Sequence, residues 1–484
     1  MGKPFNGFDD ETIFKLFGAE AAEDEIPERL KSYFFRNKSY NNIRGDLPLR
    51  ILVGHKGIGK SALLKMSYLE DIAEGVLALW LQPNELLNVA GKSEEFIQRI
   101  EQWKNNISRM ILERTLESMG TSPDASIIKQ YTWTSGRVMA QLIDILSGQK
   151  YVENVKQVFQ KKAKYFLTVP KIRVYIDDLD RGWEASKEDI KNISALINAL
   201  RDLCNEDRRI QFRIGLRTDA YFLVRTSDES TDRIESYIIP LSWTNHDILV
   251  VVATRISNFF EQSVDPVELA RLPQPEVARL IHAIIDEKFS GSGHWDRAPI
   301  HTVLLSLTRK RPRDLIKLLS GAAREAYKNG HQKISSYDLE STFPTYSTER
   351  IQDLVNEFRS EMPNIERLLY NMKNTRREFE KGYRFFYSRD RLISKIRNII
   401  QTQSLTFSNL RTVTPTSIAE FLYKIDFIIA TGRKEDEKKE WIYFDQNRML
   451  VSQFVDFGYA WEVHPAYRWA LQPDHRGKIL ETIG

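Results

Sequence analysis

Short apolar runs recur along the first half of the chain. The runs long enough to form strands buried on both faces are residues 49–53, 76–81, 172–176, 211–216 and 237–241. Amphipathic stretches with helical spacing separate several of them. This alternation predicts an α/β fold over residues 48–244, in which a parallel sheet is covered by helices.

A long helical insertion interrupts this core at about residues 93–169. Ser93 is a good N-cap because Glu94 and Glu95 follow it in the first turn. Apolar residues then recur at helical intervals from 96 to 111, and a second helical stretch covers roughly 136–166. The apolar stripes have two interpretations: packing on each other or on the core, or contact with a partner.

The remaining segments are mainly helical. We expect a helical flank over 1–47, a helical lid over 245–345, and a helical linker with a winged-helix-like domain over 346–484. The winged-helix interpretation depends on four elements, which are helices at 388–400 and 415–425 and a hairpin of 427–431 with 441–444. His464 lies among aromatic residues, which favours a packed core histidine over a ligand.

The 484 residues allow several domains, and 42% hydrophobic with 28% charged residues is an ordinary soluble composition. A net charge of +4 is too small to indicate nucleic-acid binding by the whole chain. Cys204 is the single cysteine, so an internal disulfide is excluded. The sequence has no signal peptide pattern and no apolar run long enough to cross a membrane, so we expect a cytoplasmic protein without membrane contact.

The stretch after the first apolar run fits the pattern G-x-x-x-x-G-K-[ST] at every fixed position and leads into a helix-forming segment. Strand, glycine loop and helix together predict a phosphate-binding loop rather than a chance glycine turn. Lys60 would reach the β- and γ-phosphates of ATP, and the Ser61 hydroxyl would ligate Mg²⁺. The residues expected around the phosphates are Gly54, His55, Lys56, Gly57, Ile58, Gly59, Lys60, Ser61 and Ala62.

The run at 172–176 ends in Asp177-Asp178-Leu179-Asp180-Arg181. Two acids at a strand end are often only a solvated turn, but a phosphate loop upstream needs such a pair. Asp177 would hold the Mg²⁺ shell, and Asp178 would polarise a water molecule toward the γ-phosphate.

The loop and the Asp-Asp-Leu-Asp-Arg strand end together resemble the prokaryotic KAP and STAND-like P-loop ATPases, relatives of the AAA+ group. The resemblance implies a sheet in the order 5-1-4-3-2. KAP proteins are also interrupted between the lysine and the acid pair, commonly by transmembrane helices, which this insertion does not have. The chain therefore resembles a soluble member of the group.

The same resemblance assigns roles to three arginines, each with a plainer alternative. Arg217, with Thr218 as second candidate, would sense the γ-phosphate at the end of a strand. The alternative is a strand end without a role in binding. Arg233 would reach a neighbouring subunit's nucleotide. Arg313, after Pro312 at a helix start, would be a second sensor, and the alternative is a basic turn used for solvation.

Aromatic residues 33–35 either pack in a helix over the sheet edge or stack on the adenine. Residues 371–397 hold nine Lys or Arg and three Asp or Glu, which is compatible with a phosphate-contacting face. The expected wing tip at 434–440 has three basic and four acidic residues, which favours the alternative of a protein contact or an intramolecular clamp. The basic residues singled out there are Arg376, Arg377, Arg384 and Arg391.

The resemblance implies a nucleotide-controlled switch of the kind found in bacterial antiphage defence. Such a switch would form a homo-oligomer or gate a separate effector protein, because the sequence shows no nuclease, protease or deaminase constellation. The alternatives are an ATP-dependent nucleic-acid remodeller that uses residues 371–397, and a nucleotide-binding scaffold without turnover.

Overall fold

The computed structural model describes residues 5, 7–19, 24–82, 95–118, 139, 140, 142, 143, 166, 168, 171–179, 183–227, 234–262, 264–291, 293–381, 384–408, 411–433, 439–444, 446 and 459–472. They form two compact units. The sheet unit comprises Ile26–Lys31 and Arg36–Leu241, and the helical unit comprises Met1–Glu25, Ser32–Phe35 and Ser242–Gly484. The predictions for Ser93, Glu94, Asp180, Arg181, Arg233 and nearly all of the helical stretch 136–166 lie outside the described residues.

A five-stranded parallel sheet forms the centre of the sheet unit. Its strands are β1 (Leu49–Gly54), β2 (Leu77–Leu81), β3 (Ile172–Ile176), β4 (Ile210–Arg217) and β5 (Ile238–Pro240). They lie in the order β2-β3-β4-β1-β5, with every neighbouring pair parallel. This is the order 5-1-4-3-2, so the predicted fold class, a P-loop NTPase core of the AAA+-like type, is confirmed. No strand end differs from its predicted position by more than one residue.

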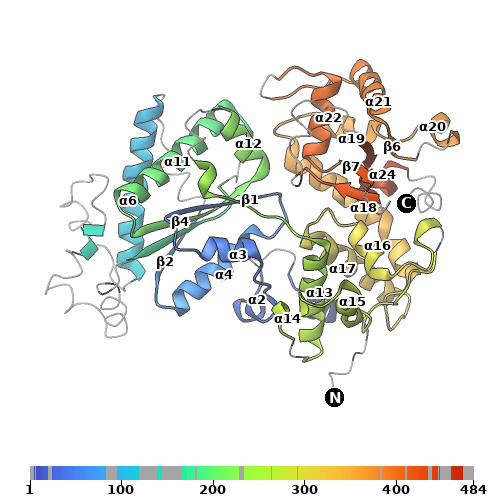
Figure 1. Ribbon diagram of the computed structural model, residues 1–484, viewed down its shortest axis with the longest axis horizontal. Helices are drawn as coiled ribbons and strands as arrows, with labels where there is room; N and C mark the ends of the chain where they lie inside the picture. Colours follow the sequence, from blue (N-terminus) through green and yellow to red (C-terminus); the bar gives the residue numbers. More distant parts are fainter. Residues whose placement is uncertain are drawn as a thin grey trace. The chain divides into compact units, whose positions relative to one another are not determined.

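Helices cover both faces of this sheet. They are α3 (Lys38–Arg44), α4 (Lys60–Ala73), α6 (Phe96–Ser118), α11 (Lys187–Glu206) and α12 (Thr218–Ser227). Figure 1 shows α3 and α4 on one face, and α6, α11 and α12 on the other. The apolar strands are buried on both faces for this reason.

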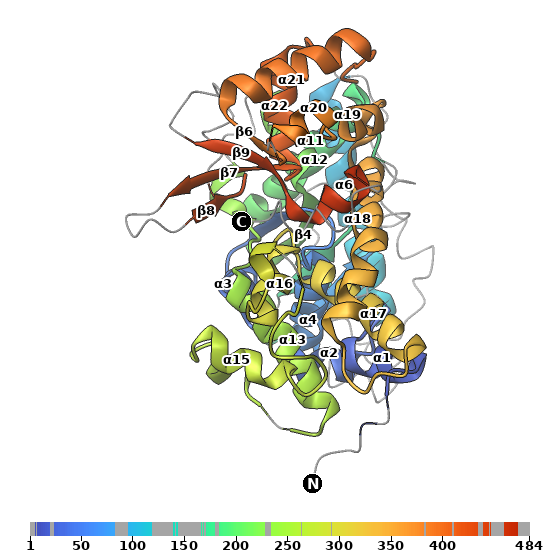
Figure 2. The same ribbon diagram turned by 90° about the vertical axis from the view of Figure 1, so that its right-hand side faces the viewer.

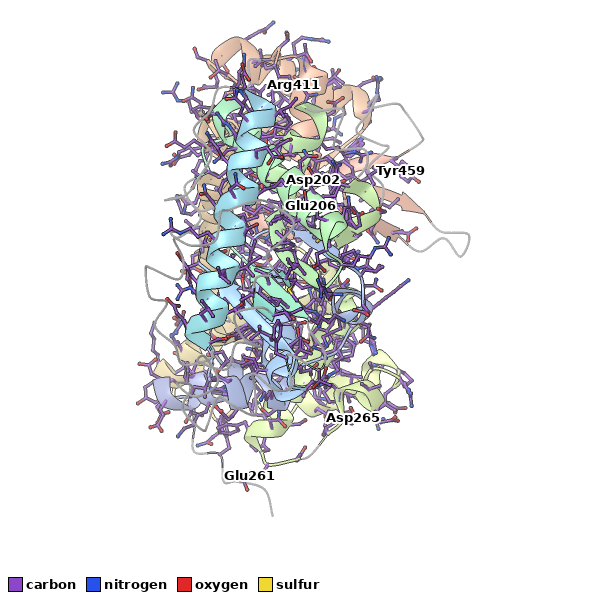
Figure 3. All side chains as sticks on the ribbon, turned by 90° about the vertical axis from the view of Figure 1, so that its left-hand side faces the viewer. Asp202, Glu206, Glu261, Asp265, Arg411 and Tyr459 are labelled. Atoms are coloured by element: carbon purple, nitrogen blue, oxygen red, sulfur yellow. The ribbon has the colours of Figure 1, made fainter. Side chains whose placement is uncertain are left out.

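Helix α6 packs on α11, so its apolar stripe covers the core rather than a partner. Trp103 is buried, and its indole N–H donates to the Asn192 side chain at 3.1 Å. The Lys104 ammonium lies 2.7 Å from the carboxylate of Glu206, a residue at the other end of α11 that is labelled in Figure 3. The insertion therefore continues the ATPase-type core as a packed layer where it is described.

A buried polar cluster holds the far end of α4. Asp71 is fully buried and accepts hydrogen bonds from Arg44 of α3, from Arg173 of β3 at 2.6 Å, and from the Tyr175 hydroxyl at 2.5 Å. Tyr175 also contacts Ser67 of α4 at 2.8 Å. Because a buried carboxylate needs this many donors, the cluster fixes α4 against both α3 and β3.

The helical unit begins with a group of helices, most of which pack around α13. Their bounds are α1 (Asp10–Phe17), α13 (Asn245–Phe259), α14 (Pro266–Leu269), α15 (Gln274–Ile281), α16 (Ile300–Ser306), α17 (Pro312–Lys328) and α18 (Ser336–Phe358). α1 contacts α13 and α17 through buried Ile13, Leu16 and Phe17 (Figure 2). The first helix of the chain thus completes a core whose other helices lie more than two hundred residues later. α2 (Pro27–Tyr33) runs through the segment where the chain passes between the units.

The C-terminal part combines short helices with a four-stranded sheet of order β6-β9-β7-β8. Its elements are α19 (Ile365–Asn371), α20 (Arg376–Glu380), β6 (Phe386–Tyr387), α21 (Arg389–Thr402), α22 (Pro415–Lys424), β7 (Ile428–Arg433), β8 (Lys439–Ile442), β9 (Ala460–Val463) and α24 (Arg468–Leu471). The two predicted helices and the antiparallel hairpin of β7 with β8 are present, and β6 and β9 extend the hairpin.

His464 is a packed core histidine, as predicted. It is fully buried, and its ring contacts the Tyr443 hydroxyl at 3.1 Å and accepts from the Ala466 N–H at 3.1 Å. Burial, together with the positive charges of Arg309 and Arg468, lowers the pKa of His464 to about 3. The ring is therefore neutral at physiological pH.

Among the helices that the structure describes, none combines the length and apolar character that crossing a bilayer requires.

Candidate functional site

The glycine loop joins the end of β1 to the start of α4. Gly57 and Gly59 have φ angles of 78° and 104°, a left-handed region that side chains disfavour. Gly59 is also the N-cap of α4 and supplies no side chain to cap it. The first turn of α4 thus begins without a side-chain acceptor, which is the arrangement that accommodates a phosphate at a helix N-terminus.

Lys60, the first residue of α4, folds back over the loop. Its ammonium group donates to the backbone oxygens of Gly54 at 2.9 Å and His55 at 3.3 Å. The charge therefore lies within the curl of the loop, where the β- and γ-phosphates of a nucleotide would be held. His55 and Ile58 are buried and Lys56 is exposed, so the outer loop residues contribute through their backbone.

Asp177 follows β3 and is 5% exposed. Burial raises the pKa of Asp177 to about 6, although a hydrogen bond with the Ser61 side chain lowers it. Its Oδ1 atom has no hydrogen-bond partner among the residues that the structure describes. The carboxylate of Asp177 and the hydroxyl of Ser61 thus converge, and one buried oxygen is left for a cation.

Asp178 differs from Asp177 in its exposure and in its backbone conformation. It is exposed, and its φ of 52° places it in the left-handed region, which costs energy for a residue other than glycine. The strained backbone turns the chain at the end of β3, so the two carboxylates occupy different environments. Asp178 raises the pKa of Asp177 by charge repulsion, after the larger effects of burial and Ser61.

Gly215 is a site residue that the sequence reasoning missed. A Cβ atom at this position of β4 would lie 2.3 Å from Oδ1 of Asp177, far inside contact distance. Only glycine therefore allows the Asp177 carboxylate to lie against β4. The available signal was an isolated glycine inside an apolar strand, which indicates close approach of another group.

The tip of β4 lies beside the loop, because Gly54 of β1 is in register with Arg217. The Arg217 guanidinium donates to both carboxylate oxygens of Asp219, at 3.0 and 2.9 Å. The next side chain, Thr218, is buried, and its hydroxyl has no partner within the described part of the chain. The geometry thus favours Thr218, the second candidate, as the group available to a ligand at this strand tip.

Arg313 belongs to the helical unit, where Pro312 begins α17 as predicted. Its role as a sensor stays a prediction. The alternative of a purely solvating basic turn is wrong for its neighbours, because Arg309 and Arg311 are buried. Arg309 donates to both oxygens of Asp314 at 2.7 and 2.8 Å, and this pairing overcomes the cost of burial and lowers the pKa of Asp314 far below its ordinary value.

The aromatic residues 33–35 are buried in the helical unit. Tyr33 donates to Glu25 at 2.8 Å and lies under the Arg255 guanidinium, and the ring of Phe35 lies 6.4 Å from that of Trp243. These side chains are therefore packed within the helical unit, and packing over the sheet edge and stacking on the adenine both stay predictions.

The arrangement fits a nucleotide and a divalent cation. A phosphate group fits the loop because the two left-handed glycines and the uncapped start of α4 leave backbone N–H groups to receive it. Mg²⁺ fits Ser61 and Asp177, since an oxygen-only pair with one unsatisfied buried carboxylate oxygen is what this cation prefers. The described residues contain no group of three or more His, Cys, Asp or Glu side chains that would hold a metal by themselves.

Comparisons with known proteins find limited likenesses. Residues 280–355 match a family model described as the FunZ-associated C-terminal helical domain. An 80.3 kDa protein of transposon gamma-delta from Escherichia coli (strain K12) is 25% identical over 197 residues, which are 40% of this chain and 26% of that protein. Allergen Alt a 2 from Alternaria alternata is 24% identical over 144 residues, 30% of this chain and 67% of the allergen. The chain thus spans about a quarter of the length of the first relative.

Solved structures with a similar arrangement include two proteins of Aeropyrum pernix. They are ORC2 in ADPNP–ADP complexes (13% identity, TM-score 0.39, 94% of this chain and 93% of that one) and ORC1 in complex with DNA (13%, 0.35, 96% of each). The RuvB Holliday junction branch migration motor of Thermotoga maritima is 12% identical, with a TM-score of 0.34 over 86% of this chain and 91% of that one. The fold assignment itself rests on the sheet order and on the loop between β1 and α4.

Proposed function

We propose that the chain binds ATP with Mg²⁺ at the loop between β1 and α4 and hydrolyses it slowly. The observation that carries the proposal is the convergence of Lys60, Ser61 and Asp177, in which Asp177 leaves one buried oxygen unsatisfied. A structural ion pair or hydrogen-bond network would satisfy that oxygen.

Each side chain would do one part of the reaction. Bound Mg²⁺ supplies positive charge against the phosphate oxygens. Ser61 and Asp177 hold the cation, Lys60 neutralises charge that develops on the transferring phosphoryl group, and the loop N–H groups orient the phosphates. Asp178 accepts a hydrogen bond from the attacking water and aligns it. Hydrolysis is slow because an aspartate reaches less far than the glutamate usual in AAA+ enzymes.

The test of binding is isothermal titration calorimetry with Mg-ATP on the wild type and on Lys60→Ala. We expect the variant to lose at least about tenfold in affinity, since it removes the ammonium group that lies within the curl of the loop. Lys65→Ala, one turn further along α4, is the matched control and should bind as the wild type does. Unchanged affinity in Lys60→Ala would remove the proposed function.

The finer role follows the resemblance to KAP and STAND-like ATPases. We infer a switch whose nucleotide state changes its own assembly or gates a separate effector protein, as in bacterial antiphage defence. Arg313 would report the phosphate state to the helical unit, and Arg217 or Thr218 would report it at β4. Mass photometry with and without Mg-ATP tests assembly, and a distribution that nucleotide leaves unchanged, alone and with the neighbouring gene product, would contradict the switch.

A second candidate, an ATP-dependent nucleic-acid remodeller, is favoured by the cationic surface of residues 371–397. Arg376 has a side chain that is 93% exposed, and its guanidinium lies 3.0 Å from the Glu380 carboxylate. Salt-dependent DNA binding that rises with ATP, and that disappears when Arg376, Arg377, Arg384 and Arg391 are neutralised, would favour this function over the switch.

A further inference from the structure

A groove of about 470 Å³ opens on the C-terminal part of the helical unit. Its walls are the end of α19, the start of α20, β6 and one face of α21, which lie together in Figure 2. Its lining comprises Asn371, Thr375, Glu378, Tyr387, Arg391, Ser394, Lys395, Asn398, Ile399 and Thr402. Six of these ten side chains carry a hydroxyl or amide group, so the groove offers hydrogen-bonding groups along its walls.

The groove follows α21 for most of that helix. Its α21 residues recur at three- and four-residue intervals from Arg391 to Thr402, so they share one face over roughly 16 Å. Ser394, Asn398 and Thr402 are exposed along this face. A long, narrow line of hydroxyl and amide groups suits an extended chain rather than a compact molecule.

The charged side chains Lys395 and Glu378 pair with each other in the inner wall of the groove. The Lys395 ammonium donates to both carboxylate oxygens of Glu378, at 2.9 and 3.1 Å, and to the backbone oxygen of Lys373 at 2.8 Å. The Tyr387 ring is buried beneath, with the Arg391 guanidinium 5.7 Å from its centre. These contacts satisfy all three donors of Lys395, so the floor of the groove is preformed.

The surroundings of the groove are cationic and carry exposed aromatic rings. Residues 371–397 have nine basic and three acidic side chains, and one of those acids, Glu378, is already paired inside the groove. Tyr370 and Phe386 adjoin groove residues in sequence and are 37% and 43% exposed. Cations with exposed rings are the surface that binds phosphodiester backbones and stacks bases.

The helix that would contact a DNA duplex in a helix-turn-helix arrangement is not available for that contact in this structure. In a helix-turn-helix arrangement α22 would enter the major groove of DNA, but its buried residues are Ser417, Ile418, Ala419, Phe421, Leu422 and Tyr423. Lys424 donates to both oxygens of Glu361, at 2.7 and 2.8 Å, and Glu420 pairs with Arg411 (labelled in Figure 3). α22 therefore presents neither free cations nor a polar face to a duplex.

We propose that the groove along α21 binds single-stranded nucleic acid. Arg391 and the surrounding cations would hold the phosphates, while Thr375, Ser394 and Asn398 would hydrogen-bond the sugars and base edges. The line of hydroxyl and amide groups along one helix face favours an unpaired strand, because its base edges are free to form hydrogen bonds. The site does not depend on the nucleotide loop, so it is tested without ATP.

The experiment is fluorescence anisotropy of a labelled mixed-sequence DNA oligonucleotide, single-stranded and as a duplex, with the full chain. We expect the single strand to bind more tightly than the duplex. Ser394→Trp fills the groove without changing charge and should weaken single-strand binding at least about tenfold, since it displaces the strand from its hydrogen-bonding wall. Gln401→Trp, on the same helix at an exposed position outside the groove lining, is the matched control.

The salt dependence provides a second measurement. Arg391→Gln should lower the slope of log affinity against log salt by about one, because one phosphate contact is lost. Arg279→Gln, an exposed arginine of α15, should leave the slope unchanged. Equal affinity for duplex, full binding by Ser394→Trp, or equal competition by an acidic polyglutamate peptide would overturn the proposal.

Discussion

The unsatisfied carboxylate oxygen of Asp177 links the stability of the protein to its chemistry. The motif of paired acids located this residue from sequence, and the loop motif located Lys60 and Ser61. The sequence did not show the burial of Asp177, because burial depends on β4, more than thirty residues later. Gly215 was missed for the same reason: a lone glycine in a strand does not say which side chain approaches it.

The raised pKa of Asp177 predicts a pH-dependent cost. The pKa of Asp177 is about 6 in the folded protein, against 3.8 for an ordinary aspartate. Ionisation therefore favours the unfolded chain as the pH rises from about 4 through 6. At neutral pH it lowers the free energy of unfolding by about 3 kcal/mol. Without Mg²⁺, Asp177→Asn should therefore increase the free energy of unfolding at about pH 7.5 by roughly 1–3 kcal/mol, and by little at about pH 4.

Urea denaturation with a metal chelator at both pH values measures this effect. Asp178→Asn is the control, because Asp178 is exposed and its replacement should change stability by less than about 0.5 kcal/mol. The same gain at both pH values would show that ionisation of Asp177 is not its cause.

Asp178→Asn has a separate kinetic consequence. The neutral amide does not have the negative charge that strengthens the hydrogen bond from the attacking water and polarises it, so phosphate release should fall at least about tenfold while Mg-ATP affinity stays the same. Asp202→Asn, on α11, is the control for loss of one acid from the sheet unit. Phosphate release from the variant at the wild-type rate would remove the role assigned to Asp178.

At the scale of elements, apolar periodicity predicted the five strands and the helices around them well, because strands buried on both faces and amphipathic helices leave strong local patterns. The polar contacts that fix these elements join residues far apart in sequence. Asp71 and Arg173 are one example, and no local pattern relates them. The sequence therefore predicted which elements form, but not the buried ion pairs that hold α4.

Gly215→Ala tests the contact between β4 and the acid. The added methyl group would lie 2.3 Å from Oδ1 of Asp177 and must displace the carboxylate from the Ser61 side. We expect at least about tenfold weaker Mg²⁺-dependent nucleotide binding in calorimetry. Nucleotide binding without Mg²⁺ should change less, and equal losses in both conditions would point to a general distortion of β4.

Asp71→Asn tests the cluster at the far end of α4. Removing the charge leaves Arg44 and Arg173 without their shared buried partner, and the free energy of unfolding should fall by about 3–5 kcal/mol. Asp46→Asn removes a largely exposed carboxylate that pairs with Lys171 and should cost less than about 1 kcal/mol. Chemical denaturation of both variants, read by circular dichroism, provides the comparison, and similar losses would contradict a special role for Asp71.

At the scale of the whole molecule, the main surprise concerns the first helix. The pattern of α1 shows an amphipathic helix, but an apolar stripe does not indicate which partner covers it. The structure joins Met1–Glu25 to the helical unit, where Phe17 O accepts a hydrogen bond from Arg255 of α13. The chain thus contributes to both units before the sheet begins.

Phe17→Ala should therefore destabilise the helical unit, although the residue lies near the N-terminus. Phe17 is fully buried, and truncation of a buried phenylalanine costs about 3–5 kcal/mol. Phe14→Ala on the same helix is the matched control, because Phe14 is 44% exposed and should cost about 1 kcal/mol or less. Equal losses in thermal unfolding would mean that α1 does not pack against α13 and α17 in solution.

The place of α1 also imposes a delay during synthesis on the ribosome. More than two hundred residues separate α1 from α13, so at about 5–20 residues per second the nascent helix emerges roughly ten seconds or more before its partner is translated. During that interval Ile13, Leu16 and Phe17 remain exposed to holding chaperones. The N-terminal edge of the helical unit therefore cannot form until α13 and α17 have been translated, after the last strand of the sheet.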